Sequence, residues 1–304
     1  MSSLKAAESG FSRLRLPVGG DAEIELWRQS PLKVSGIGDM MPVVVAGGFG
    51  KRMNHGAGLA LYLAGNGFDV YRYDTLDHVG LSSGCMLDFT MTRGLLSMRT
   101  VVDWVSRETG SKVHVVAGSL SARMAYRLLA ESDVVANLIT IVGVVNLGAT
   151  LARVLGHDYA AESHESLPEV MTVEGHEVRA RPFWVDVHEN KWLGKEPCRD
   201  ELLRSHQPVT AILAKDDLWV DQGEVRDVLT AQSRRQLGIV SLGGAVHDLG
   251  RNMVAARNLY ITVCSAAMGF EGRTATEPEE PSFQMVVAQS LYETRMQRAG
   301  IAGN

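Results

Sequence analysis

The stretch from Val113 to Tyr126 constrains the fold most, because it joins a strand, a tight turn and a helix around one serine. Its first residues, Val-His-Val-Val-Ala, are mostly β-branched and predict a buried strand. A turn of small residues centred on Ser119 follows, and the remaining residues predict an amphipathic helix. A strand that breaks sharply into a helix at a serine exposes the hydroxyl at the edge of a sheet. The stretch therefore predicts an α/β fold with Ser119 as a candidate nucleophile.

The chain on both sides of this stretch alternates between strand and helix patterns. Apolar runs predict strands at 41–46, 68–73, 134–145, 208–214 and 239–242, and amphipathic patterns predict helices at 54–66, 92–109 and 248–268. Such alternation predicts a mostly parallel central sheet flanked by helices, with right-handed crossovers. Residues 22–27 alternate polar and apolar residues and predict an antiparallel edge strand, whereas residues 1–20 predict a loose lead-in.

Changes in composition divide the chain into a core, an insertion and a tail. The strand–helix alternation covers 20–148 and 207–270, which we expect to form the core. Residues 149–206 are richer in charge, histidine and aromatic residues, and predict a lid inserted over the sheet. The tail, 271–304, begins with an acidic, proline-containing linker that is expected to be disordered. It ends in a predicted helix with one apolar side, made of Phe283, Val286, Val287 and Leu291.

Bulk composition excludes several classes of function. The net charge of −5 over 304 residues gives no basic footprint, so nucleic acid is not an expected partner. The three cysteines are widely spaced without a CxxC pair, which indicates a reduced, cytoplasmic protein. The N-terminus has no apolar signal core, and no stretch reaches the roughly 18 apolar residues of a membrane span. We therefore expect a cytoplasmic protein without stable membrane insertion.

Serine chemistry needs a base in hydrogen-bond reach and an acid that orients the base. Asp216 and Asp217 follow the strand at 208–214, and His247 follows the strand at 239–242. The order serine, acid, histidine is that of enzymes with a serine on an α/β sheet. Either aspartate can supply the acid, and Asp217 is preferred because it lies three residues before Val220. The alternatives are that Ser119 only caps a helix and that the aspartates cap the next helix.

The serine turn departs from the pattern G-x-S-x-G at both outer positions, where this chain has Ala117 and Ser121. Both residues are small enough for the close approach of strand and helix. A developing oxyanion needs two backbone N–H groups, and we expect them at Leu120 and at Phe49 in the glycine-rich turn after the strand at 41–46.

No metal or nucleotide cofactor is expected. The other histidines show no H-E-x-x-H pattern and no close pair with metal-ligand spacing. The turn from Gly47 to Lys51 lacks the spacing of a phosphate-binding loop.

Six short runs of the chain carry a resemblance to a known family. They include Tyr71-Arg72-Tyr73-Asp74, His78-Val79-Gly80-Leu81-Ser82-Ser83-Gly84, Ser119-Leu120-Ser121-Ala122-Arg123 and His247-Asp248-Leu249-Gly250. In these runs the chain resembles the bacterial luminescence acyltransferases, the lux-type, myristoyl-ACP-specific thioesterases, from about residue 20 to 265. The resemblance implies an α/β-hydrolase fold and a triad of Ser119, Asp217 and His247. It also implies transfer of a fatty acyl group from acyl carrier protein to the serine, and then to water or a partner reductase.

The sequence thus predicts a serine-dependent acyl-thioester hydrolase or acyltransferase that acts on fatty acyl-ACP or acyl-CoA. We expect the acyl chain in an apolar tunnel under residues 150–206. One alternative is a carboxylesterase or a chain-releasing thioesterase of a polyketide or peptide pathway. Another is a catalytically inactive binding module with the same fold, and a third is a tail that docks a partner.

Overall fold

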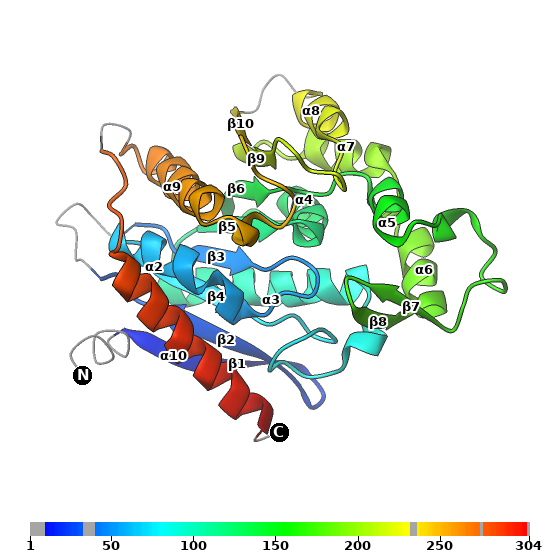
Figure 1. The fold of residues 1–304 in the computed structure, drawn as a ribbon, viewed down its shortest axis with the longest axis horizontal. Helices are drawn as coiled ribbons and strands as arrows, with labels where there is room; N and C mark the ends of the chain where they lie inside the picture. The colour runs from blue at the N-terminus through cyan, green and yellow to red at the C-terminus, as the bar shows by residue number, and fades with distance from the viewer. Residues whose placement is uncertain (1–9, 33–39, 232–235, 274–275, 303–304) are drawn as a thin grey trace.

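The computed structural model describes residues 10–32, 40–231, 236–273 and 276–302, which are built around an eight-stranded sheet (Figure 1). Its strands are β1 (Phe11–Gly19), β2 (Ala22–Gln29), β3 (Val43–Ala46), β4 (Val70–Tyr73), β5 (Val113–Gly118), β6 (Val135–Ile141), β9 (Val209–Ala214) and β10 (Leu237–Leu242). Their spatial order is β1-β2-β4-β3-β5-β6-β9-β10. All neighbouring strands from β4 to β10 are parallel. The pairs β1–β2 and β2–β4 are antiparallel. The predicted fold class is confirmed.

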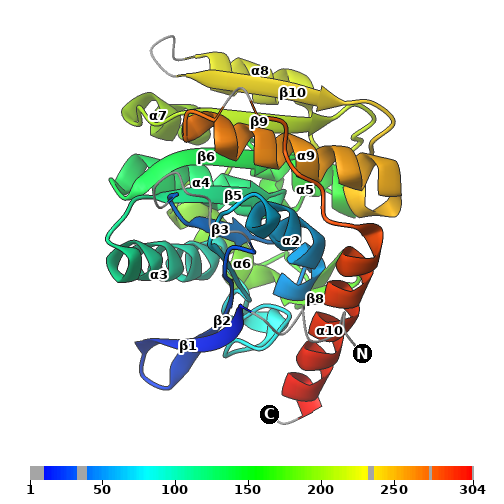
Figure 2. The same cartoon turned by 90° about the vertical axis from the view of Figure 1, so that its left-hand side faces the viewer.

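Helices cover both faces of the sheet (Figure 2). One face packs against α3 (Met91–Thr109), α4 (Leu120–Glu131) and α8 (Gln222–Thr230), and the other against α2 (Ala57–Gly65) and α9 (Met253–Phe270). Short 3₁₀ turns precede the helices of the second face: η1 (Met53–Gly56) before α2 and η4 (Leu249–Arg251) before α9. We call the apolar residues between the sheet and helices α2 and α9 the second core, and those on the face of α3, α4 and α8 the first core. The second core contains Val116 of β5 and Val45 of β3, which are aligned on neighbouring strands and so share one apolar layer.

Helix α9 departs from the expectation that no segment resembles a membrane span. By length and composition its 18 residues are apolar enough to cross a bilayer. In the structure its Val263, Cys264 and Ala267 are buried against the sheet. The apolar character of α9 therefore serves the second core of the fold.

The segment between β6 and β9 is a compact insertion. It contains α5 (Leu147–Leu155), η3 (Tyr159–Ala161), the hairpin of β7 (Val170–Val173) and β8 (His176–Arg179), α6 (Ala180–Glu189) and α7 (Lys195–Arg204). The buried carboxylate of Glu201 in α7 pairs with Arg123 (2.5 Å) and Arg127 (2.6 Å) of α4. The Arg127 guanidinium also lies 3.5 Å from the ring centroid of Trp192. These contacts fix the insertion to the core, and its role as a lid stays a prediction.

Residues 11–19 are not the loose lead-in that was predicted, because they form β1. This strand pairs with β2 from Phe11 opposite Gln29 to Gly19 opposite Ala22. The strand is stabilised in this position because Leu16 belongs to the first core and Leu14 packs against it. The rest of that predicted lead-in, 1–9, lies outside the described residues.

The acidic linker in the tail is fixed in place, against the expectation of disorder. The side-chain amide of Asn66 donates to the carbonyl of Glu279 (2.9 Å) and accepts from the Glu279 N–H (2.8 Å). The carboxylate of Glu280 accepts two hydrogen bonds of 2.6 Å from Arg257. The linker is held because its backbone bonds to Asn66 at the C-terminal end of α2 and the carboxylate of Glu280 pairs with Arg257 of α9.

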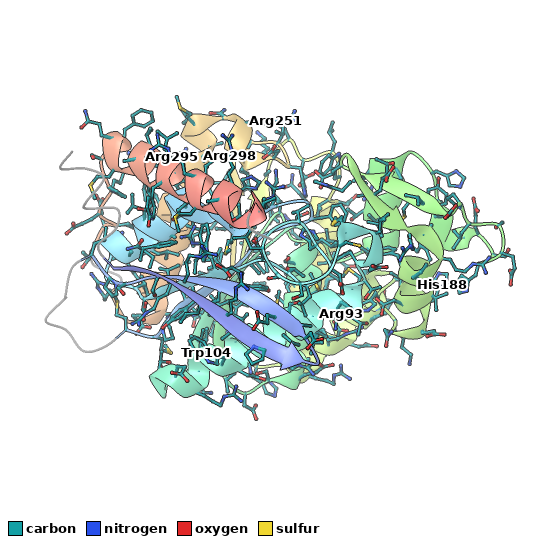
Figure 3. The ribbon with its side chains drawn as sticks, turned by 90° about the horizontal axis from the view of Figure 1, so that it is seen from below. Arg93, Trp104, His188, Arg251, Arg295 and Arg298 are labelled. Carbon is teal, nitrogen blue, oxygen red and sulfur yellow. The ribbon has the colours of Figure 1, made fainter. Side chains whose placement is uncertain are left out.

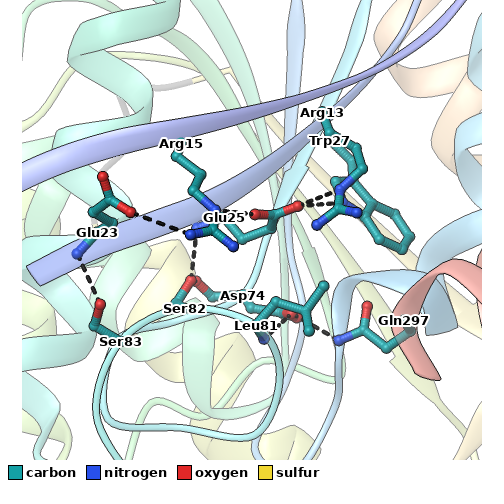
Figure 4. Close-up of polar contacts among 10 residues, drawn as sticks. All are labelled: Arg13, Arg15, Glu23, Glu25, Trp27, Asp74, Leu81, Ser82, Ser83 and Gln297. Atoms are coloured by element: carbon teal, nitrogen blue, oxygen red, sulfur yellow. Dashed lines mark hydrogen bonds and ion pairs between the residues drawn. The ribbon is translucent and has the colours of Figure 1, made fainter. Parts of the chain in front are cut away.

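The last helix, α10 (Phe283–Ala302), docks through polar side chains. The buried carboxylate of Glu293 accepts from the Arg72 guanidinium at 2.6 and 2.7 Å. Close by, Gln297 donates to Asp74 (2.9 Å), which also accepts the backbone N–H of Leu81 (Figure 4). Figure 3, which views the molecule from below, shows Arg295 and Arg298 on α10. The face of α10 that meets the core is therefore its polar one.

Candidate functional site

Ser119 lies at a strained turn between β5 and α4. Its backbone has φ 49° and ψ −118°, a conformation that residues with a Cβ rarely adopt. The side chain makes no capping hydrogen bond to α4. Instead its Oγ lies 2.8 Å from Nε2 of His247. The alternative that Ser119 only caps the helix is therefore wrong.

The two unusual residues of the serine turn have distinct structural reasons. Ala117 is completely buried in β5, where it belongs to the first apolar core cluster. The hydroxyl of Ser121 donates a 2.5 Å hydrogen bond to the carbonyl of Gly47 in the turn after β3. A Cβ on Gly48 would lie 3.1 Å from the Cβ of Ser119, which shows how closely the two turns approach. A serine at 121 thus links the two turns, which a glycine could not do.

The structure brings Asp217, and not Asp216, to His247. Oδ2 of Asp217 lies 2.8 Å from Nδ1 of His247, and its side chain is only 2% exposed. Oδ1 accepts the backbone N–H groups of Trp219 (2.8 Å) and Val220 (3.1 Å). Asp216 is exposed. The cap of α8 is Asp221, so neither predicted aspartate has the alternative role of capping that helix.

The surroundings of Asp217 keep its carboxylate charged. Burial alone would raise its pKa, but the hydrogen bond and charge of His247 together with the two N–H donors lower it overall. A carboxylate that stays ionised can hold the Nδ1–H of His247 and leave Nε2 free to accept a proton. The arrangement Asp217–His247–Ser119 is therefore chemically able to activate the Ser119 hydroxyl.

The glycine-rich turn after β3 is held by His78, a histidine to which the sequence assigned no role in the site. The N–H of Gly50, a residue with φ 68°, donates to Nε2 of His78 (3.1 Å). Phe49 is buried and packs edge-on against the His78 ring at 5.4 Å. Burial, with His176 as a second cause, lowers the pKa of His78 to about 4, so its Nε2 stays an acceptor at neutral pH. The predicted oxyanion donors, Phe49 and Leu120, thus lie in turns that meet at Ser119, and their role stays a prediction.

The insertion also contributes residues to the site that were missed from the sequence. The turn between β7 and β8 brings Glu174 to the region of Ser119, and burial raises the pKa of its carboxyl group. His176, the first residue of β8, packs against Phe49 at 6.2 Å. The Glu-Gly pair between two valine-containing segments is a hairpin signal that could have located this turn. The ring of Trp219 lies 4.5 Å from the ring of His247, and no sequence pattern predicts that Trp219 belongs to the site.

Two spaces open on Ser119. One is a cavity of about 500 Å³ that Ser119 and His247 line together with residues of η1, α2, η4 and α9. The other is a space of about 30 Å³ under the insertion, lined by Leu151, Val178 and Phe183 among others. The predicted tunnel under 150–206 corresponds to the smaller of the two, which has room for about two water molecules.

Among the described residues no group of three or more His, Cys, Asp or Glu side chains could hold a metal ion. The nearest approach between two histidines joins Nε2 of His164 and Nδ1 of His188 at 2.9 Å in the insertion. No third ligand accompanies them in the part of the chain that the structure describes.

Comparison of the sequence with known proteins gives matches along nearly the whole chain. A sequence model described as "Acyl transferase" matches residues 14–301. An acyl transferase of Vibrio campbellii is 38% identical over 284 residues, which is 92% of this chain and 92% of that protein. An acyl transferase of Photorhabdus luminescens is 41% identical over 257 residues, or 84% of this chain and 83% of that protein.

Comparison with solved structures shows the fold. Est1E from Butyrivibrio proteoclasticus, with ferulic acid bound, superposes with a TM-score of 0.66 at 16% identity, over 86% of this chain and 99% of that one. A monoacylglycerol lipase of Paleococcus ferrophilus gives a TM-score of 0.59 at 17% identity, over 81% and 99%. Both are α/β hydrolases, so the fold of this chain is that of the α/β hydrolases.

Proposed function

The chain belongs to the acyl transferase family that the sequence resemblance indicated, and from this premise we propose a serine acyl-thioester hydrolase or acyltransferase. Its family and fold make it an enzyme that acts on acyl groups. The substrate in this proposal is a fatty acyl group on acyl carrier protein or coenzyme A. The acceptor is water or a partner enzyme, and the location is the cytoplasm.

The first half of the reaction transfers the acyl group to Ser119. His247 Nε2 takes the Ser119 proton while Oγ attacks the thioester carbonyl, and Asp217 stabilises the imidazolium that forms. The Leu120 and Phe49 N–H groups stabilise the tetrahedral oxyanion. When the C–S bond breaks, the proton on His247 passes to the leaving thiolate, which departs as a thiol and leaves an acyl-serine ester.

The second half of the reaction releases the acyl group. His247 removes a proton from water or from an acceptor hydroxyl or thiol, and the resulting nucleophile attacks the acyl-serine carbonyl. Collapse of the intermediate breaks the bond to Oγ, and His247 returns the proton to Ser119. The products are a free carboxylic acid or an acylated acceptor, and the enzyme is restored.

The observation that carries this proposal is the chain of 2.8 Å contacts from Asp217 through His247 to a serine with positive φ. Backbone strain of this kind clusters at functional sites. The interaction of an ionised aspartate with Nδ1 also selects the imidazole tautomer that the mechanism requires.

Intact-mass spectrometry with acyl-ACP and acyl-CoA tests the proposal. We expect a covalent adduct of one acyl group on the wild-type chain, mapped to Ser119, and no adduct on Ser119→Ala. A fluorophosphonate probe should label the wild type and not the variant. Parallel reactions with simple esters distinguish a carboxylesterase, which would turn them over faster than thioesters. Thioester turnover that persists undiminished in Ser119→Ala would overturn the proposal.

A further inference from the structure

The cavity of about 500 Å³ lies between the sheet and the helices of its second face. Its floor follows from strand register: Val45 of β3 is aligned with Arg72 of β4 on one side and with Val116 of β5 on the other. Residues aligned on adjacent strands point to the same face, and all three line the cavity. Leu59 of α2 and Leu259 of α9 line it from the helices that cover this face. The cavity therefore runs along the sheet from Ser119 towards β4.

The interior of this cavity suits a chain without polar groups. Val45, Leu59, Val116, Val142 and Leu259 are all buried apolar side chains. The arm that carries a thioester in coenzyme A or acyl carrier protein contains amide groups. Burying an amide without a hydrogen-bond partner is costly, whereas an alkyl chain gains free energy from burial. Apart from Arg72, the charged residues of the lining, such as Lys51 and Asp248, are partly or fully exposed, which places them at its mouth.

The far end of the path is marked by a buried cation. The Cα atom of Arg72 lies about 14 Å from that of Ser119, as counted from the strand register. This distance combines two strand spacings of about 4.8 Å across the sheet with three residues of about 3.3 Å along β5, at right angles to each other. The terminal nitrogens of Arg72 bind Glu293, but its buried Nε–H has no acceptor among the described residues. Because the ion pair with Glu293 holds this buried side chain in place, Arg72 forms the end wall of the cavity, and an alkyl chain that reaches it gains no further burial.

We propose that the acyl chain of the thioester occupies the cavity between the sheet and helices α2 and α9, and that Arg72 marks the limit of its length. This assignment rests on the proposed acyl-serine chemistry and places the chain opposite the insertion. The thiol arm then leaves through the mouth at Lys51 and Asp248. The space under the insertion stays too small for the chain.

A pair of leucine-to-tryptophan substitutions tests which space holds the chain. Leu59→Trp fills the cavity, and Leu151→Trp, in α5, fills the space under the insertion. Rates of acyl-enzyme formation are measured for acyl-CoA thioesters and nitrophenyl esters of increasing chain length. We expect Leu59→Trp to slow long chains at least tenfold relative to short ones with both leaving groups, and Leu151→Trp to leave the chain-length profile unchanged. The milder Leu259→Phe carries the same test if Leu59→Trp does not fold.

Two outcomes would overturn the assignment. A shortened profile in Leu151→Trp would place the chain under the insertion. A loss in Leu59→Trp that affects coenzyme A thioesters but not nitrophenyl esters would place the thiol arm in the cavity.

A labelling experiment separates this inference from the catalytic proposal. A fatty acid with a photoreactive diazirine at its last carbon is irradiated with the Ser119→Ala protein, and labelled peptides are identified by mass spectrometry. Labels in 53–65 or 249–260 support the assignment even if no acyl-serine is ever found. Labels confined to 150–184 contradict it.

Discussion

The two sides of Ser119 are built differently. On one side the insertion packs down on the serine and leaves a space of about 30 Å³, and it is pinned by a buried carboxylate between two arginines. On the other side η1 and η4 stand apart from the sheet and leave about 500 Å³. The side that looks like a lid in the sequence is the filled one. An inserted segment can therefore act as a fixed wall of an active site while the fold's own helices provide the room.

The largest effect should come from the centre that both sides share. Asp217→Asn should lower the rate of Ser119 acylation about 10⁴-fold, because an amide can hold His247 in the wrong tautomer. Asp216→Asn is the matched control and should stay within about threefold, since Asp216 is exposed. Stopped-flow or quenched-flow acylation rates check both variants. Equal losses in the two would remove Asp217 from its assigned role.

The next effect distinguishes the fixed side from the open one. Glu201→Gln should destabilise the protein by about 3–5 kcal/mol, because it leaves two arginines without their buried carboxylate. Asp248→Asn breaks a 3.7 Å ion pair with Lys51 at the open mouth and should cost under about 1 kcal/mol. Urea unfolding of both variants measures the contrast. Similar losses would mean that the two sides are equally fixed.

A smaller effect is expected at the turn between the two sides. His78→Phe keeps the packing on Phe49 but removes the acceptor of the Gly50 N–H. We expect kcat to fall about 10²-fold with little change in KM, because a displaced oxyanion donor weakens mainly the transition state. His78→Gln, which can offer an oxygen to Gly50, should recover part of this loss. A change in KM alone would show that the turn serves substrate binding.

The smallest effect is a dependence of stability on pH. His78 has a pKa near 4 in the folded protein, below the ordinary value of 6.5, so the unfolded chain binds more protons between these values. Its contribution is present above pH 6.5 and is lost as the pH falls towards 4. Between pH 7 and pH 5 it amounts to about 2 kcal/mol. Urea midpoints of the wild type should fall more steeply over this range than those of His78→Phe, and parallel slopes would contradict the burial of a neutral His78.

The order of the site residues could be predicted from the sequence because it depends on chain order in a parallel sheet. Each candidate follows a strand, and the carboxyl ends of parallel strands meet at one edge. The choice between Asp216 and Asp217 needed the structure. Consecutive side chains in a loop point in different directions, and here the N–H groups of Trp219 and Val220 fix the direction of Asp217.

The tail shows where a pattern of apolar residues misleads. Phe283 and Leu291, on the apolar side predicted for α10, are 70% and 55% exposed. The buried side carries Gln289, Glu293 and Gln297, whose partners come from β2, β4 and the loop after β4. Periodicity reveals a helix and its two sides. Which side is buried depends on the polar groups of the core that need partners, here Gln29, Arg72 and Asp74. Those groups were not recognised as buried in the sequence.

The pairing of Arg72 with Glu293 has a consequence for how the chain is made. The two residues are 221 positions apart, so Arg72 leaves the ribosome long before its partner exists. Until the last helix is synthesised, the second face of the sheet holds an unpaired cation that cannot be buried at low cost. Synthesis of α10 is therefore the event that completes this face. A ribosome stalled before the final helix would present a nascent sheet that chaperones could still recognise as unfinished.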